Sequence, residues 1–355
     1  MRFCNLTKTL IGLYVFLFGI SLFARPVLAE VSFKGKTILL RVGHRVGGGT
    51  DRAARLVGLF LPKYLPGKPK IIMQNMPGGE GTKAANYFAT QVKPDGLLIE
   101  MGGNSELDHF RMKTAPVRFD PSKFEFLGGL NRGGSVIMVR KDARKRLTDR
   151  SAKPVIVGAV TGNRTWNAMV LWSAEYLGWN VKWVVGYRGG RVLLTAMRRG
   201  EIDLTSNSSA FAIREMVNDG VADLITQTGT FSKGKFHRRS SLMELPTFVE
   251  LLGDKKPKGL AWEAYLAWVR SVQVDKWIAL PPGTPREIVQ VHQLAFEKVV
   301  KDPEFIRLAK KQLSIDITAT TREDVKSLIK DLVDTPEEAN AYIFKIKKKY
   351  GLPTR

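Results

Sequence analysis

Apolar and polar positions along the chain form a repeating strand–helix pattern that begins at residue 36. The apolar run 36–43 (KTILLRVG) predicts a buried strand, and residues 53–64 then place apolar side chains at helical spacing on one face. The runs 70–76 and 96–104 predict two further strands, separated by a helix over 82–92. Strands that alternate with helices in this way build a parallel sheet with helices on its faces.

A second block repeats this design. Residues 153–163 predict a strand and a glycine-containing turn, and 164–178 a helix that ends at a glycine. Residues 181–190 predict a strand and a turn, 191–204 a helix followed by a short strand, and 222–229 another strand. The chain therefore holds two α/β blocks, and its 355 residues suffice for two cores.

Two segments connect the blocks. Residues 124–143 suit a crossing from the first block to the second, and residues 274–285 suit the return. Only helices are expected after that, two of them opened by capping boxes at Thr284 and Thr335. Thr50 is the expected N-cap of the helix that follows the first strand.

Three strands of the first block end in glycine-rich loops, the first of which is GHRVGGGTD (43–51). That loop nearly matches a nucleotide-binding P-loop, but Gly49 stands where the lysine belongs, which argues against nucleotide hydrolysis. Backbone N–H groups at a helix N-terminus attract an anion without a lysine. Because ligands sit at the carboxyl ends of such strands, the loops favour a small carboxylate, with a simple chain-reversing turn as the alternative.

Composition adds an export signal and an anionic partner. The net charge is +23 and the isoelectric point is near 10.1, which favours an anion without identifying it. Residues 1–29 resemble a secretory signal peptide, with Arg2 and Lys8, an apolar core over 10–24, and a VLA cleavage motif. Cleavage before Glu30 predicts an exported, periplasmic protein. An uncleaved anchor is the alternative, although Arg25-Pro26 ends the apolar run early.

The same composition argues against several kinds of catalytic site. The only cysteine, Cys4, lies in the signal, so thiolate metal sites and disulfides are not expected. The four histidines are scattered without metal spacing, and we expect neither a metal nor a cofactor. Ser208 and Ser209 lack a G-x-S-x-G elbow, which leaves an exported esterase as a minor alternative.

Several motifs in order resemble the substrate-binding receptors of tripartite tricarboxylate transporters, the Bug or TctC family. Residues 47–51 match the family's glycine-rich loop and the aspartate that follows it. Asn75, Pro77 and Gly78 match its second loop, and residues 94–96 match its Pro-Asp-Gly turn. VVGYRGG, RRGEIDL, ELPTFVEL and ALPPGTPREIV match later motifs, so the resemblance covers nearly all of 36–355. The chain departs from the family at Arg45 and Val46, which replace two prolines, at Gly79-Glu80, and in the second-block loop GAVTGNRTWNAM.

The resemblance implies a two-lobed type II periplasmic-binding-protein fold, with a mainly parallel sheet in each lobe and the ligand cleft between them. Lobe 1 would comprise 30–133 and 273–355, lobe 2 would comprise 134–272, and hinge crossings would lie near 131–136 and 272–280. The family holds a small carboxylate between the lobes and presents it to integral-membrane permease subunits. We therefore expect a monomeric receptor, not an enzyme, whose partners are a small organic acid and a permease, and not nucleic acid. A periplasmic sensor without a transport role is the alternative.

The candidate ligand-binding residues come from the predicted loops of both lobes. They are Arg45, Gly47, Gly48, Gly49, Thr50, Gly78, Gly79, Gly103, Asn104, Thr161, Asn163, Arg164, Tyr187 and Asp203. Arg45 and Arg164 offer guanidinium groups that either clamp a carboxylate or lie solvated on the surface. Tyr187, like Trp166, either stacks on a ligand or packs in the core, and Asp203 would accept from a ligand hydroxyl or amine. Asp51 is expected to fix its loop. The lysines of KIKKKYG (345–351) are expected to be solvated, with contact to anionic lipid or the permease as the alternative.

Overall fold

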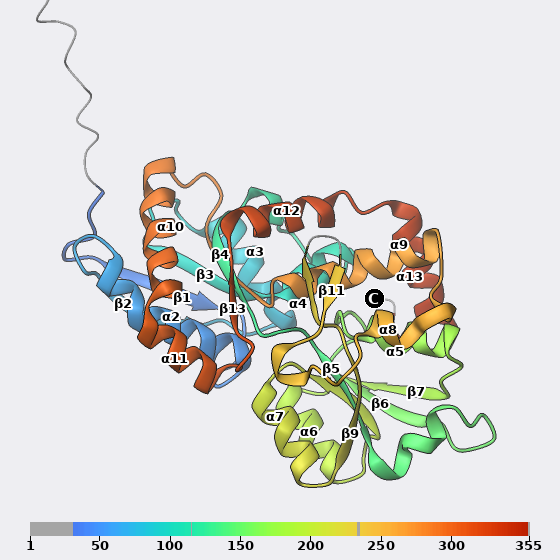
Figure 1. The fold of residues 1–355 in the computed structure, drawn as a ribbon. Helices are drawn as coiled ribbons and strands as arrows, with labels where there is room; N and C mark the ends of the chain where they lie inside the picture. The colour runs from blue at the N-terminus through green and yellow to red at the C-terminus, as the bar shows by residue number, and fades with distance from the viewer. Residues whose placement is uncertain (1–30, 115, 233–234, 354–355) are drawn as a thin grey trace, which may run out of the picture. The chain divides into compact units, whose positions relative to one another are not determined.

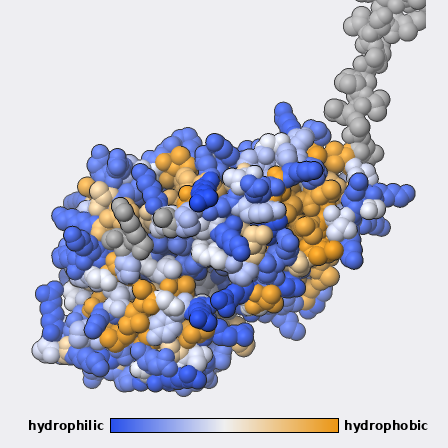
Figure 2. Space-filling model, turned by 180° about the vertical axis from the view of Figure 1, so that it is seen from behind, coloured by the Kyte–Doolittle hydropathy of each residue, from blue (hydrophilic) through white to orange (hydrophobic). Residues whose placement is uncertain are grey.

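The computed structural model describes residues 31–114, 116–232 and 235–353, of which those from Phe33 onward belong to one compact unit. The predicted signal peptide lies outside the described residues. Among the residues that are described, no helix is long and apolar enough to cross a membrane. Figure 2 shows hydrophilic residues over most of one face, with hydrophobic residues in separate patches.

The first sheet has six strands in the order β13-β4-β12-β3-β1-β2 (Figure 1). Its strands are β1 (Thr37–Val42), β2 (Lys70–Asn75), β3 (Leu98–Gly103), β4 (Glu125–Asn131), β12 (Lys276–Leu280) and β13 (Thr318–Thr320). Strand β1 is parallel to β2 and β3, whereas β12 is antiparallel to β3 and β4, and β13 to β4. The sheet is therefore mixed, and the expectation of helices alone after residue 285 is wrong at β13.

Six helices accompany this sheet. They are α2 (Gly49–Tyr64), α3 (Thr82–Gln91), α4 (Asn104–Arg111), α10 (Arg286–Lys301), α11 (Pro303–Gln312) and α12 (Arg322–Val333). The predicted apolar stripe of α2 is buried from Ala53 to Leu61. One core cluster joins Phe88 of α3, Phe124, Trp277 of β12 and Leu328 of α12.

The second sheet has five strands in the order β7-β6-β8-β5-β9. They are β5 (Val136–Arg140), β6 (Val155–Ala159), β7 (Val181–Val185), β8 (Leu204–Asn207) and β9 (Ala222–Gln227). Strand β6 is parallel to β7 and β8, and β5 is antiparallel to β8 and β9. A hairpin of β10 (Thr230–Ser232) and β11 (Lys235–His237) follows β9.

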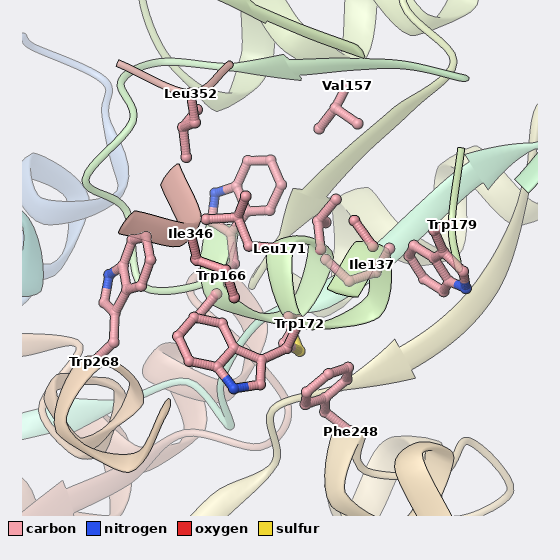
Figure 3. Packing of buried hydrophobic residues seen from close by; sticks show 14 of the residues in the cluster. Ile137, Val157, Trp166, Leu171, Trp172, Trp179, Phe248, Trp268, Ile346 and Leu352 are labelled. Carbon is pink, nitrogen blue, oxygen red and sulfur yellow. The ribbon is translucent and has the colours of Figure 1, made fainter. Parts of the chain in front are cut away.

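The helices around the second sheet include the last helix of the chain. They are α5 (Asn167–Tyr176), α6 (Gly190–Arg198), α7 (Ala210–Asn218), α8 (Phe248–Leu252), α9 (Leu260–Val269) and α13 (Glu337–Lys349). Figure 3 shows Ile346 of α13 and Leu352 among Trp172, Trp268 and Val157 in one hydrophobic cluster. The lobe boundaries expected from the sequence remain a proposal, and these contacts argue for placing α13 with the second lobe.

The two connections between the sheets lie against each other. The chain passes from β4 to β5 through Arg132–Ser135 and returns into β12 through Val274 and Asp275. The side-chain amide of Asn131 donates to the carbonyl oxygens of Val272 (3.1 Å) and Gln273 (2.8 Å), which joins one connection to the other. These segments lie where the hinge crossings were predicted, and their role as hinges stays a prediction.

Candidate functional site

The loop between β1 and α2 is fixed by a buried aspartate. Asp51 accepts a hydrogen bond from the backbone N–H of Gly47 (2.8 Å) and others from Arg55 Nε (2.9 Å) and Asn75 Nδ2 (2.8 Å). Burial raises the pKa of Asp51, but these partners outweigh it, so the pKa lies below its usual value. The predicted loop-fixing role of Asp51 is confirmed. The predicted N-cap, Thr50, is wrong: the helix is capped by Gly48, and Thr50 lies inside its first turn.

A group of residues that we call the cationic corner comprises Thr50, Gly103, Arg132, Asp275 and Lys276. A Cβ atom added to Gly103 would lie 3.4 Å from both Lys276 Nζ and Thr50 Oγ1, and one added to Gly49 would lie 3.0 Å from Arg132 Nη1. The first turn of α2, the end of β3 and the start of β12 therefore meet here. The free N–H groups at a helix N-terminus add to the positive potential.

Asp275 holds both cations of this corner. Its carboxylate accepts from Arg132 Nε and Nη2, and from Lys276 Nζ at 2.8 Å. Burial lowers the pKa of Lys276 to about 8, although the Asp275 carboxylate opposes the shift. Among Arg132, Asp275 and Lys276, one positive charge is in excess while Lys276 is protonated, and the buried Glu106 lies beside them, where it accepts from the backbone N–H of Gly103 (3.0 Å).

A second group, which we call the Glu80 corner, comprises Glu80, His109, Thr161 and Arg164. The carboxylate of Glu80 forms an ion pair with Arg164 and accepts from Thr161 Oγ1 (2.7 Å) and His109 Nε2 (3.1 Å). Burial raises the pKa of Glu80, but the charge of Arg164 and the bonds from His109 and Thr161 lower it to about 2. The loop after β2 is thus joined to the loop after β6 of the other sheet.

A further, buried contact joins α4 to the loop after β6 and to the segment that follows α9 (Leu260–Val269). Asp108 of α4 is buried and accepts from the backbone N–H of Thr165 (3.1 Å) and from Ser271 Oγ (2.8 Å). Burial raises the pKa of Asp108, against the opposing charge of Arg111. The loop after β2 and helix α4 of the first sheet therefore both lie against the loop 160–166 of the second.

The structure brings most of the predicted ligand residues to these loops. Gly47, Gly48, Gly49 and Thr50 lie at the start of α2, Gly78 and Gly79 precede Glu80, Gly103 and Asn104 lie where β3 meets α4, and Thr161 and Arg164 belong to the Glu80 corner. The backbone N–H of Asn104 donates to Asp275 O (3.2 Å). Arg45 lies on the exposed part of the first loop. The predicted clamp by Arg164 holds a carboxylate of the protein itself.

Three predicted ligand residues make their contacts away from these strand-end loops. Asp203 lies just before β8, at the opposite end of that strand, where it pairs with Arg146 (2.9 Å) and accepts from the N–H of Ile156 (2.9 Å). Asn163 is buried and accepts from Lys347 Nζ of α13 (2.8 Å), because the C-terminal helix packs behind its loop.

The third is Tyr187, which packs against the hydrophobic cluster of the second sheet with α6 and α7. Trp166 likewise packs in the core, 6.1 Å from the ring of Trp183.

Two other sequence interpretations are settled by local contacts. Lys347, expected to be solvated, is fully buried, whereas Lys349 pairs with Glu175 at 2.6 Å. Ser209 caps α7, and Ser208 lies 3.3 Å from the hydroxyl of Ser135, so the contacts of both serines are structural.

Sequence reasoning missed Arg132, Asp275, Lys276 and His109 as site residues. The signal for the first three was present, because charged residues stand at both predicted crossings, in LNRGG and VDKW. Charged side chains at a crossing are placed beside the strand-end loops of the sheet that the chain enters or leaves. His109 carried no such signal, since its position on α4 depends on where that helix begins.

Comparisons with known proteins support the fold. No protein-family model and no curated protein sequence matches the chain. Among solved structures, a TctC solute-binding protein from Polaromonas is 20% identical, covers 88% of this chain and 98% of its own, and gives a TM-score of 0.60. MatC from Rhodopseudomonas palustris with bound malate is 17% identical (86% and 98% covered, TM-score 0.62). Another protein from that species, with adipate, is 20% identical (89% and 97% covered, TM-score 0.63). The chain therefore has the two-lobed α/β fold of the TctC-type solute-binding proteins.

Proposed function

We propose that this protein is an extracytoplasmic solute receptor of the Bug/TctC type, which captures a small carboxylate between its lobes. The cationic corner is the observation that carries the proposal, because it keeps one buried positive charge at a helix N-terminus. A carboxylate ion fits that position by charge and by hydrogen bonding to N–H groups. The structural neighbours that hold malate and adipate support this ligand class.

The hinge connections support capture by lobe closure. Arg132 and Asp275 belong to the two connections, so a ligand in the cationic corner contacts the segments about which the lobes rotate. Closure removes the ligand from water, which strengthens each charge-assisted bond. No catalytic base is needed for this action, so the protein acts as a receptor and not as an enzyme.

A thermal-shift screen tests ligand binding. Mono-, di- and tricarboxylates, with malate and adipate among them, are compared with nucleotides on the mature protein. A ligand at a hundredfold excess over Kd stabilises the folded state by about 2.7 kcal/mol. We expect at least one carboxylate to raise the melting temperature. Stabilisation by nucleotides alone would contradict the proposal.

We further propose that the receptor is exported to the periplasm as a monomer, and that it delivers its ligand to the membrane subunits of a tripartite tricarboxylate-type permease. Uptake of the radiolabelled acid by cells with and without the gene tests delivery. Loss of uptake on deletion supports transport. Unchanged uptake together with loss of an acid-dependent transcriptional response would support the sensor alternative.

A further inference from the structure

The Glu80 corner contains a carboxylate of the protein that is held as a captured ligand would be. Its partners come from both lobes: His109 from α4 of the first, and Thr161 and Arg164 from the loop after β6 of the second. The carboxylate has 11% of its side chain exposed, so it is nearly withdrawn from water. Thr161 and His109 donate to one carboxylate oxygen, Oε2, and the Arg164 guanidinium pairs with the other, Oε1, so both oxygens face cationic or hydrogen-bonding groups of the kind that bind carboxylates.

The backbone at Glu80 is unfavourable for a residue other than glycine. Its φ is +52°, and its neighbours Gly79 and Gly81 have φ of +54° and +101°. A side chain with a Cβ atom costs about 1 kcal/mol in this left-handed region, and burial of its charge adds to the cost. Since glycine would fit this turn better, the fold alone does not account for a glutamate here.

The two corners differ in their charge balance. Arg164 is paired with Glu80, so the second-lobe cation is already neutralised. In the cationic corner, Arg132 and Lys276 share the carboxylate of Asp275, and one positive charge remains. The two corners are neighbours, because Ser105, two residues after Gly103 of the cationic corner, donates from Oγ to the backbone oxygen of Glu80 (2.9 Å).

We propose that Glu80 is a specificity-determining residue that fills one of two anion positions and leaves the other, in the cationic corner, for the ligand. A ligand then brings one carboxylate, and a second carboxylate aimed at Arg164 is repelled by Glu80. The statement about the ligand rests on the proposed receptor function, whereas the occupancy of the position by Glu80 does not. Glu80 contributes the anion that a dicarboxylate would otherwise supply.

Acetate tests the occupancy without knowledge of the natural ligand. The Glu80→Ala variant vacates the position, and sodium acetate is compared with sodium chloride at equal ionic strength. We expect acetate near 100 mM to raise the melting temperature of Glu80→Ala by about 2 °C. Wild type and Glu80→Gln, in which the position stays filled, are expected to show a smaller acetate effect, since acetate can then bind only in the cationic corner. Glu244→Ala, at an exposed glutamate, is the matched control.

An equal acetate effect in wild type, Glu244→Ala and Glu80→Ala would overturn the proposal, as would no effect in a folded Glu80→Ala. If Glu80→Ala does not fold, Glu80→Gly replaces it, because glycine suits the left-handed backbone. The acetate comparison is then made on that variant with the same expected result.

Two homologous series test specificity: acetate to hexanoate, and malonate to adipate, each titrated by calorimetry. We expect the tightest ligand of wild type to be a monocarboxylate and Glu80→Gly to gain at least tenfold in affinity for a dicarboxylate. A wild type that prefers a dicarboxylate would overturn the proposal.

If no carboxylate binds any variant except acetate to Glu80→Ala, the proposed receptor function fails, and the proposal that Glu80 fills an anion position stands. If carboxylates bind wild type but acetate has no selective effect, the receptor function stands and this inference fails.

Discussion

Replacing Gly48 by aspartate separates ligand binding from folding. Gly48 is the N-cap of α2, with φ −69° and ψ 167°, a backbone that any residue adopts. An aspartate there accepts hydrogen bonds from the first-turn N–H groups and is among the preferred N-cap residues. Its carboxylate would take the N–H groups that the ligand needs. We therefore expect Gly48→Asp to fold normally and to lose ligand binding.

The size of the loss follows from charge repulsion. Two unit charges about 4 Å apart repel by roughly 4 kcal/mol at an effective dielectric of 20, which corresponds to several hundredfold in Kd. The melting temperature without ligand should change little, because the new cap is favourable and its repulsion from nearby Asp51 is opposed by Arg55. The two quantities are measured by calorimetric titration with the best carboxylate of the screen and by thermal unfolding.

Gly48→Ala and Gly48→Ser are the controls. A Cβ atom at Gly48 would lie 3.1 Å from Arg45 O, so alanine requires a shift of a few tenths of an ångström and should cost only modest affinity. Serine caps the helix without a charge and should fall between alanine and aspartate. Binding by Gly48→Asp within about threefold of wild type would refute the reasoning and place the anion elsewhere.

Three further perturbations test the charged interior. Lys276→Met should weaken carboxylate binding at least tenfold. The affinity of wild type should fall as pH rises through about 8, where Lys276 loses its proton, whereas the affinity of the variant should not change over this range. Calorimetric titration at several pH values checks both expectations. Burial raises the pKa of Glu100 to about 8 despite the charge of Arg41, so the folded state holds a proton that the unfolded state releases. Stability should fall from about pH 4.5 to 8, by at most about 1.4 kcal/mol per pH unit, and urea unfolding of Glu100→Gln should show a flatter profile. Arg239→Met leaves the buried carboxylate of Asp316 without its cation, so the free energy of unfolding measured in urea should fall by about 3 kcal/mol. A loss below about 1 kcal/mol would show that the hydroxyls of Ser240 and Ser241 stabilise this carboxylate without the cation.

The sequence predicted the parallel strands well, because each is a short apolar run between turn residues. The runs 36–43, 70–76 and 96–104 became β1, β2 and β3 within two residues at each end. The antiparallel strands β4 and β12 were seen only as crossings, since a glycine-rich apolar segment gives no periodicity from which to infer pairing.

The helix caps were predicted less well. Thr284 and Thr335 were expected to open capping boxes, but Pro285 and Pro336 occupy the N-cap positions. The hydroxyl of Thr284 donates instead to Pro281 O (2.8 Å), and that of Thr335 to Asp331 O (3.2 Å). A threonine hydroxyl bonds to whichever backbone group is nearest, and that choice depends on the preceding turn.

The glycine loops of the candidate site were predicted from the sequence, and its charged groups were not. Glycine loops at strand ends are local features, and the sequence predicted them. The cations depend on long-range pairing: Arg132 and Asp275 are 143 residues apart, and Glu80 meets Thr161 across the two lobes. Such pairs follow from how two sheets face each other, which residue spacing does not encode. Asp203 was misplaced for the same reason, since its position at the far end of β8 depends on strand register.

Native mass spectrometry of the exported protein, purified without refolding, tests the central claim most directly. Wild type and Gly48→Asp are compared, each titrated with the carboxylates of the screen. We predict a one-to-one complex of wild type with a small organic acid, either co-purified or formed in the titration, and no such complex of Gly48→Asp. Equal binding by the two proteins, or the absence of a complex of wild type with any carboxylate, would contradict the account.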